Sequence, residues 1–162
     1  MRRGLRWVRP AALWFTALGF GAAGLQARPG GSADRAVVDP AATAQVNAQV
    51  DSALSRILSY TPQDTAATAL AAEDLLSGTA STQYQMLFAQ VKRQIGSQKL
   101  TVTTKVTHSG VVSLTGDQAQ LLVFVQQTAQ RQGAAASTVD GQLSVTARLI
   151  DGHWRISDMT ER

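Results

Sequence analysis

The sequence predicts an α+β domain in which three helices cover one face of an antiparallel sheet. Apolar residues recur at three- and four-residue spacing through residues 43–98, which is the period of amphipathic helices. After residue 98 the period falls to two and β-branched residues become frequent, as in half-buried strands. Helices first and a meander of strands second is the order expected of a sheet covered on one side.

Three helices are expected. The first begins at Thr43 and ends before Pro62, because the residue preceding a proline is disfavoured in a helix. The second is expected to start with Thr61 as its cap and Pro62 at its first position, and to stop near Gly78. The third covers residues 81–98. Its apolar stripe consists of Tyr84, Leu87, Phe88, Val91 and Ile95.

The first two strands follow directly. Alternation of apolar residues with threonine and lysine begins at Leu100 and predicts a half-buried strand. Gly110 predicts a bulge or a sharp bend in it, before the sequence VVSLT. After a short turn, the LLVFV sequence at 121–125 is apolar on both faces, so we interpret residues 119–130 as a central strand.

The last two strands form a hairpin. Residues 133–141 are expected to be a loop and residues 142–150 the third strand, and the Asp-Gly pair at 151–152 is a signal for a tight turn into the fourth. Alternation predicts one face of the hairpin made of Leu143, Val145, Ala147, Leu149, Trp154, Ile156 and Asp158. The opposite face of the last strand is expected to hold His153, Arg155, Ser157 and Met159. We therefore interpret Trp154 as a core residue and His153 as exposed.

The charge distribution argues against nucleic-acid binding. Five of the 15 Lys and Arg side chains lie in the first 28 residues, and the remaining ten are balanced by the 11 Asp and Glu side chains. The body of the chain is therefore nearly neutral, despite a pI of about 10.1. It lacks the basic face that would neutralise several phosphates.

The basic N-terminus predicts export. Residues 1–27 combine this basic region with an apolar run at 11–25 and are interpreted as a signal-anchor segment. The expected arrangement is a single-pass membrane protein with its C-terminal domain outside the cytoplasm. The alternative is a secreted protein cleaved near Ala27. Residues 28–42 have a Pro- and Gly-rich linker composition, and residues 43–162 are the expected folded domain.

No catalytic motif or cofactor motif occurs in the sequence. There is no cysteine, neither of the two histidines belongs to a metal-ligand motif, and G-x-S-x-G and phosphate-binding loops are absent. We therefore expect no catalytic residues, no cofactor and no metal. His108 is in phase with Val106 and is expected on the buried face, bonded to a backbone group. A general base in a cavity is the alternative for His108.

Four segments together resemble the Mce-associated membrane proteins of actinobacterial cell envelopes. They are ILSY (57–60), LLSGTASTQY (75–84), GVVSLTGDQAQLLVFVQQT (110–128) and VTARLIDGHWRISDM (145–159), and the resemblance covers roughly residues 45–160. It implies an NTF2-like cone, in which three helices pack on a strongly curved sheet. It also implies a non-catalytic role, assembling or stabilising an Mce-type lipid importer, with the importer subunits or other Mce-associated proteins as partners.

Two other functions remain open at this stage. The first is a small-molecule or lipid binding module with a pocket in the cone. Its expected lining is Tyr84, Phe88, Val106, His108, Phe124 and Trp154. The second is an enzyme of the ketosteroid-isomerase or hydratase sort, for which His108 with Tyr84 is the one conceivable pair.

Overall fold

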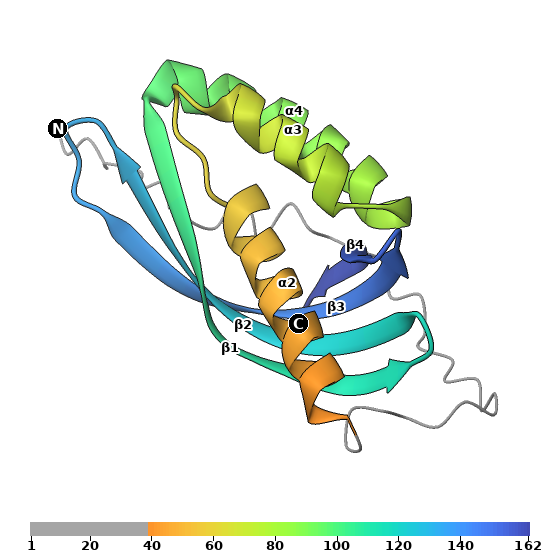
Figure 1. Cartoon of the computed structure of the whole chain (residues 1–162). Helices are drawn as coiled ribbons and strands as arrows, with labels where there is room; N and C mark the ends of the chain where they lie inside the picture. Colours follow the sequence, from red (N-terminus) through yellow and green to blue (C-terminus); the bar gives the residue numbers. More distant parts are fainter. Residues whose placement is uncertain (1–38) are drawn as a thin grey trace, which may run out of the picture.

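A computed structural model describes residues 39–162 and contains three helices and a four-stranded sheet (Figure 1). Its elements are α2 (Pro40–Ile57), α3 (Thr65–Leu75), α4 (Gly78–Gln98), β1 (Leu100–Thr115), β2 (Gln118–Arg131), β3 (Ser137–Ile150) and β4 (His153–Glu161). The strands pair antiparallel in the order β1-β2-β3-β4. The predicted α+β fold is therefore confirmed, and β2 lies inside the sheet as expected. The predicted anchor and the linker up to residue 38 lie outside the described residues.

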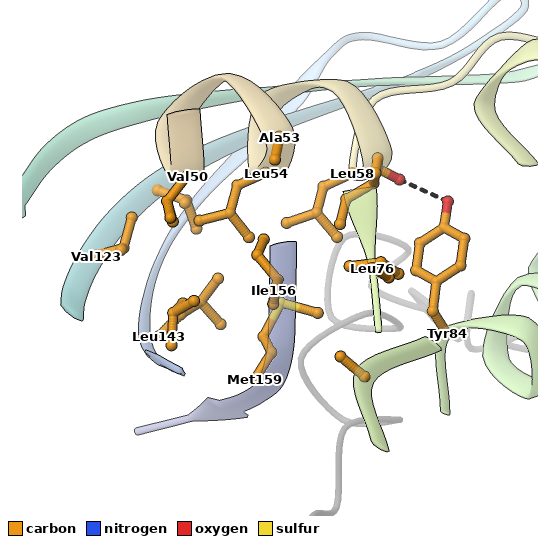
Figure 2. Packing of buried hydrophobic residues seen from close by; sticks show 14 of the residues in the cluster. Val50, Ala53, Leu54, Leu58, Leu76, Tyr84, Val123, Leu143, Ile156 and Met159 are labelled. Carbon is orange, nitrogen blue, oxygen red and sulfur yellow. Dashed lines mark hydrogen bonds between the residues drawn. The ribbon is translucent and has the colours of Figure 1, made fainter. Parts of the chain in front are cut away.

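The sheet is strongly curved, and the helices lie on its concave side (Figure 1). Helix α2 crosses this side and contacts β1, β2 and β4, while α4 contacts β1 and β4 and α3 contacts β4. Between the layers lies one apolar core, part of which is drawn in Figure 2. Within residues 39–162, no helix combines the length and the apolar character needed to cross a membrane.

Helix α2 begins at Pro40, earlier than the expected Thr43. The Asp39 carboxylate accepts a hydrogen bond from the backbone N–H of Ala42 at 2.9 Å, and proline follows at the first helical position. Both features stabilise a helix start, because they satisfy or remove N–H groups that have no partner inside the helix. The Asp-Pro pair is the signal in the sequence that marks this boundary.

The predicted start of the second helix is wrong. Helix α3 begins at Thr65 with Asp64 as its N-cap, not at Thr61 and Pro62. Tyr60 instead forms an isolated bridge with Val102 of β1, through two backbone hydrogen bonds of 2.9 Å. This long-range pairing holds the chain extended where local sequence favours a cap, so the helix can begin only after the turn that follows.

The joint between α3 and α4 is tied to the edge of the sheet. Leu76 forms a parallel bridge with Ile156, and the Ser77 N–H donates to the Ile156 carbonyl at 2.8 Å. Helix α4 then starts at Gly78, where φ is +52° and a Cβ would lie 3.4 Å from the Ser157 carbonyl oxygen. Glycine fits this position because it tolerates a positive φ and the close approach of β4.

Strand β1 runs without a break through Gly110, and its irregularities flank that residue. The register shifts between Val106 and His108, and again between Val111 and Ser113. Strand β3 begins at Ser137, inside the segment expected to be a loop. Pairing with β2 explains the earlier start, because the register continues to Ser137 opposite Ala129.

Strand β4 contains a bulge that alternation alone did not predict. Thr146 pairs with Asp158 and Ala147 pairs with Ile156, so Ser157 is an extra residue. The bulge turns Met159, expected on the outer face, into the core, where it is 3% exposed (Figure 2). Trp154 and Ile156 are buried as predicted.

Leu149 faces the concave side, as its pairing with Trp154 requires, but it is 38% exposed. Its predicted burial is wrong because it lies at the hairpin end of the sheet. The Asp-Gly hairpin itself is confirmed: Asp151 and Gly152 both have positive φ, as a type I′ turn requires.

Candidate functional site

The six residues expected to line a pocket in the cone do not meet in one cavity. Tyr84 and Phe88 belong to the core between the helices and the sheet, where their rings stack with centroids 5.3 Å apart. The Tyr60 ring meets Phe88 edge-on at 6.1 Å. These rings pack against one another, so no open pocket separates them.

Tyr84 has a structural partner for its hydroxyl group. The hydroxyl donates a hydrogen bond of 2.7 Å to the carbonyl of Ile57, at the last residue of α2 (Figure 2). Burial, with a smaller contribution from Tyr60, raises the pKa of Tyr84 far above its ordinary value. The phenol therefore stays neutral and links α4 to a carbonyl that lacks a partner within its own helix.

His108 and Phe124 lie on the convex face, away from Tyr84. The two residues are cross-strand partners, His108 is exposed, and Phe124 is 40% exposed. The expectation of a buried His108 is wrong because Thr107 is an extra residue in β1, and it reverses the alternation after Val106. Val106 itself packs against the core.

A buried polar cluster escaped the sequence-based predictions. The Thr104 hydroxyl donates to the Leu58 carbonyl at 2.7 Å and accepts from the Gln127 side-chain amide at 3.0 Å. The Thr104 N–H donates to the Ser59 hydroxyl oxygen at 2.8 Å. The cluster ties the end of α2 to β1 and satisfies its own polar atoms, so its arrangement favours a structural role.

A small cavity lies between α3 and α4. Its volume is about 240 Å³, and Ala72, Leu76, Tyr84 and Phe88 are among its lining residues. Glu73 and Lys92 are also among them. The volume lies below the roughly 300 Å³ at which ordinary ligand pockets begin.

A larger groove of about 600 Å³ lies where α2, the end of α3 and β4 meet. Ala53, Leu75 and Trp154 contribute apolar surface, and His153 and Arg155 also line it. The Trp154 N–H donates to the Gln49 side-chain oxygen at 2.8 Å, which fixes β4 against α2. Trp154 is thus both a core residue and a groove residue.

No cluster of three or more potential metal ligands occurs within residues 39–162. Asp51 has the most distinctive environment among the carboxylates described. Its Oδ2 accepts a 2.7 Å hydrogen bond from the Ser109 hydroxyl, while its buried Oδ1 has no hydrogen-bond partner. Desolvation raises the pKa of Asp51, and the Ser109 hydrogen bond partly opposes that rise.

The sequence is similar to two Mycobacterium tuberculosis proteins described as uncharacterised, MT1407 of strain CDC 1551 and Rv1362c of strain H37Rv. Each is 32% identical over 122 residues, which are 74% of this chain and 55% of the relative. The chain therefore spans about half the length of these relatives. No protein-family profile matches the sequence.

Solved structures share the fold at low sequence identity. CagV, a VirB8 homolog of the type IV secretion system of Helicobacter pylori, matches with a TM-score of 0.62 at 11% identity, over 73% of this chain and 96% of CagV. The periplasmic domain of DotI matches with a TM-score of 0.62 at 12% identity, over 72% and 92%. An NTF2-like superfamily protein of Salmonella enterica matches with a TM-score of 0.53 at 15% identity, over 74% and 91%. The domain has an NTF2-like, VirB8-like fold.

Proposed function

We propose that this chain is a non-catalytic, membrane-tethered accessory protein whose NTF2-like domain lies outside the cytoplasmic membrane. In that place it docks on subunits of an Mce-type lipid importer, or on other Mce-associated proteins, and stabilises their assembly. The basic N-terminus followed by an apolar run supports the tether and the orientation. The resemblance of residues 45–160 to the Mce-associated proteins supports the choice of partner.

The observation that carries this proposal is that the residues expected to form a catalytic pocket in the cone are not arranged for catalysis. In enzymes of this fold type, a catalytic pocket needs a desolvated acid or base facing a hydrogen-bond donor. Here Tyr84 donates its hydroxyl to a backbone carbonyl, and His108 lies on the opposite face of the sheet. The aromatic rings occupy part of the space that a substrate would need. A role in binding other proteins is consistent with such a filled interior.

The fold similarity agrees with this proposal. DotI contributes a periplasmic domain of this fold, and CagV is described as part of a secretion system. Both proteins contain a domain of this fold, and in DotI that domain is periplasmic. We propose the same location for the present domain.

Photo-crosslinking of the full-length protein in its own membranes tests the proposal. A photoreactive residue is placed at exposed Thr107 on the sheet or at exposed Gln90 on α4, and crosslinked species are purified and identified by mass spectrometry. We expect importer subunits or Mce-associated proteins in the adducts from at least one position. A known membrane complex serves as the positive control for crosslinking. If that complex crosslinks normally and the protein forms adducts only with itself, the result would argue against the accessory role.

A further inference from the structure

The groove beside β4 combines an apolar wall with basic side chains. Ala53, Leu75 and Trp154 contribute apolar surface from α2, α3 and β4. His153 and Arg155 also line it, because β4 is an edge strand and side chains from both of its faces reach the groove. The volume of about 600 Å³ lies within the range of about 300–1,000 Å³ that is usual for small-molecule sites.

Arg155 has a second arginine as its cross-strand partner. It pairs with Arg148 of β3, so the two arginine side chains start from opposite positions on one face of the hairpin, and Arg155 lines the groove. Like charges in directly opposite positions destabilise a sheet. Within residues 39–162 neither guanidinium forms an ion pair, and the buried Nε of Arg155 has no hydrogen-bond partner. Asp74 of α3 also lines the groove but forms no ion pair with Arg155.

An arginine pair with an unfilled buried donor is an arrangement that an anion would complete. Guanidinium groups bind phosphate and carboxylate groups with paired, charge-assisted hydrogen bonds. A bound anion would satisfy the donors of Arg155 and offset the repulsion from Arg148. The apolar wall beside Arg155 would take up a hydrocarbon chain, because burial removes the chain from water.

We propose that the groove between α2, α3 and β4 binds an amphiphile with one compact anionic head, a phosphate or a carboxylate, and one alkyl chain. The head lies at Arg155, next to Arg148, and the chain lies against Ala53, Leu75 and Trp154. This ligand site is independent of the proposed docking role, since either can hold without the other.

Trp154 supplies the measurement, because it forms part of the groove wall. The protein has three tryptophans, so Trp7→Phe and Trp14→Phe in the full-length chain leave Trp154 as the one emitter. Decyl phosphate is titrated below its critical micelle concentration while Trp154 fluorescence is followed. We expect a saturable change in intensity and wavelength. Arg155→Gln should weaken binding at least tenfold, whereas Lys105→Gln, which removes an exposed charge on β1, should leave it unchanged.

Two further ligands separate the head from the chain. Inorganic phosphate alone should bind at least tenfold more weakly, since it lacks the alkyl chain, and decyltrimethylammonium should bind at least tenfold more weakly, since its head is cationic. Equal binding of either ligand overturns the proposal, as does a decyl phosphate titration without saturation. Ser52→Leu, at an exposed helix position lining the groove, is a second variant that fills the site without touching the charges. It should also weaken binding at least tenfold, and unchanged affinity would contradict the location.

This test is separable from that of the proposed function. Crosslinking to importer subunits with no binding of decyl phosphate would refute the ligand site and support the accessory role. Binding of decyl phosphate without such crosslinks would do the reverse.

Discussion

Leu121 and Leu122 are neighbours in β2, yet they lie in different environments. Leu121 is 2% exposed on the concave face, under the helices, whereas Leu122 lies on the convex face and is only half-buried. The same contrast continues along the strand with Val123, fully buried, and Phe124, 40% exposed. A run of five apolar residues is typical of a strand covered on both sides, but here only one side is covered by helices.

The two faces of the sheet therefore contribute differently to the stability of the domain. The concave face determines stability, because every buried methylene there is removed from water and packed. The convex face carries polar cross-strand pairs, namely Thr128 with Thr138 at 3.0 Å and Gln126 with Asp140 at 3.1 Å. Substitutions on the two faces should consequently differ in stability cost even when the residue type is the same.

Trp154→Ala should have the largest effect. Trp154 is 6% exposed at the end of the concave face, and loss of its side chain should lower the free energy of unfolding by about 3–5 kcal/mol. Its cross-strand partner Leu149 is 38% exposed, so Leu149→Ala should cost less than about 1 kcal/mol. Urea denaturation of both variants measures the difference. Similar losses would show that the helices cover the hairpin end as well.

Comparing the stability losses of Leu121→Ala and Leu122→Ala tests the difference between the two faces directly. The first should cost about 2–5 kcal/mol, since Leu121 is buried in the core. The second should cost less than about 1 kcal/mol, because the convex side chain keeps part of its contact with water in the folded state. Thermal and chemical denaturation report both values. A large loss for Leu122→Ala would indicate that something covers the convex face, such as a partner subunit.

Much of this two-layer arrangement could be predicted from the sequence. The helical and strand periods identified the layers, and the two-residue turn at Asp151-Gly152 fixed the hairpin register. That register also implies that Arg148 and Arg155 are cross-strand partners, so this pair of charges at the groove could have been predicted. The groove as a whole could not, since α2, α3 and β4 meet only in the folded protein.

The errors have two physical causes. Extra residues at Thr107 and Ser157 reverse the alternation, and neither position carries a glycine or another local signal for a bulge. As a result His108 and Met159 were each assigned to the wrong face. The second cause is long-range pairing, as where the bridge from Tyr60 to Val102 delays the start of α3.

Tyr84→Phe probes whether the concave layer also depends on a polar contact. The substitution keeps the ring that stacks on Phe88 but removes the hydrogen bond to the Ile57 carbonyl. Leaving that buried carbonyl without its donor should cost about 1–3 kcal/mol. Equilibrium unfolding at neutral pH gives the value, and no measurable loss would mean that water replaces the hydroxyl.

The same variant should change the response to alkaline pH. The folded-state pKa of Tyr84 is raised, so its contribution to stability is fully present below the unfolded pKa of about 10 and is lost as the pH rises above it. Wild-type protein should therefore lose more stability than Tyr84→Phe between about pH 9 and pH 11. Parallel curves for the two proteins would contradict the burial of the phenol.

Asp51→Asn should have the smallest effect on stability. It tests the edge of the region where helices cover the sheet, at the contact between α2 and β1. Desolvation raises the pKa of Asp51, so the charged carboxylate is less stable in the folded state than in the unfolded state. The contribution of Asp51 is favourable below its unfolded pKa and is lost as the pH rises through its folded pKa. At pH 7 the substitution should therefore stabilise the protein slightly, and the gain should vanish as the pH falls to about 4.

Ser109 supplies the control for this substitution. Its hydroxyl donates to the Asp51 carboxylate at 2.7 Å, and a charged acceptor makes a stronger hydrogen bond than a neutral amide. Ser109→Ala should therefore cost more stability at pH 7 in the wild-type protein than in the Asp51→Asn background. A double-mutant cycle at pH 7 and pH 4 measures this coupling. A coupling that stays the same at both pH values would mean that the charge of Asp51 is solvated, and that the covered layer ends before it reaches this part of α2.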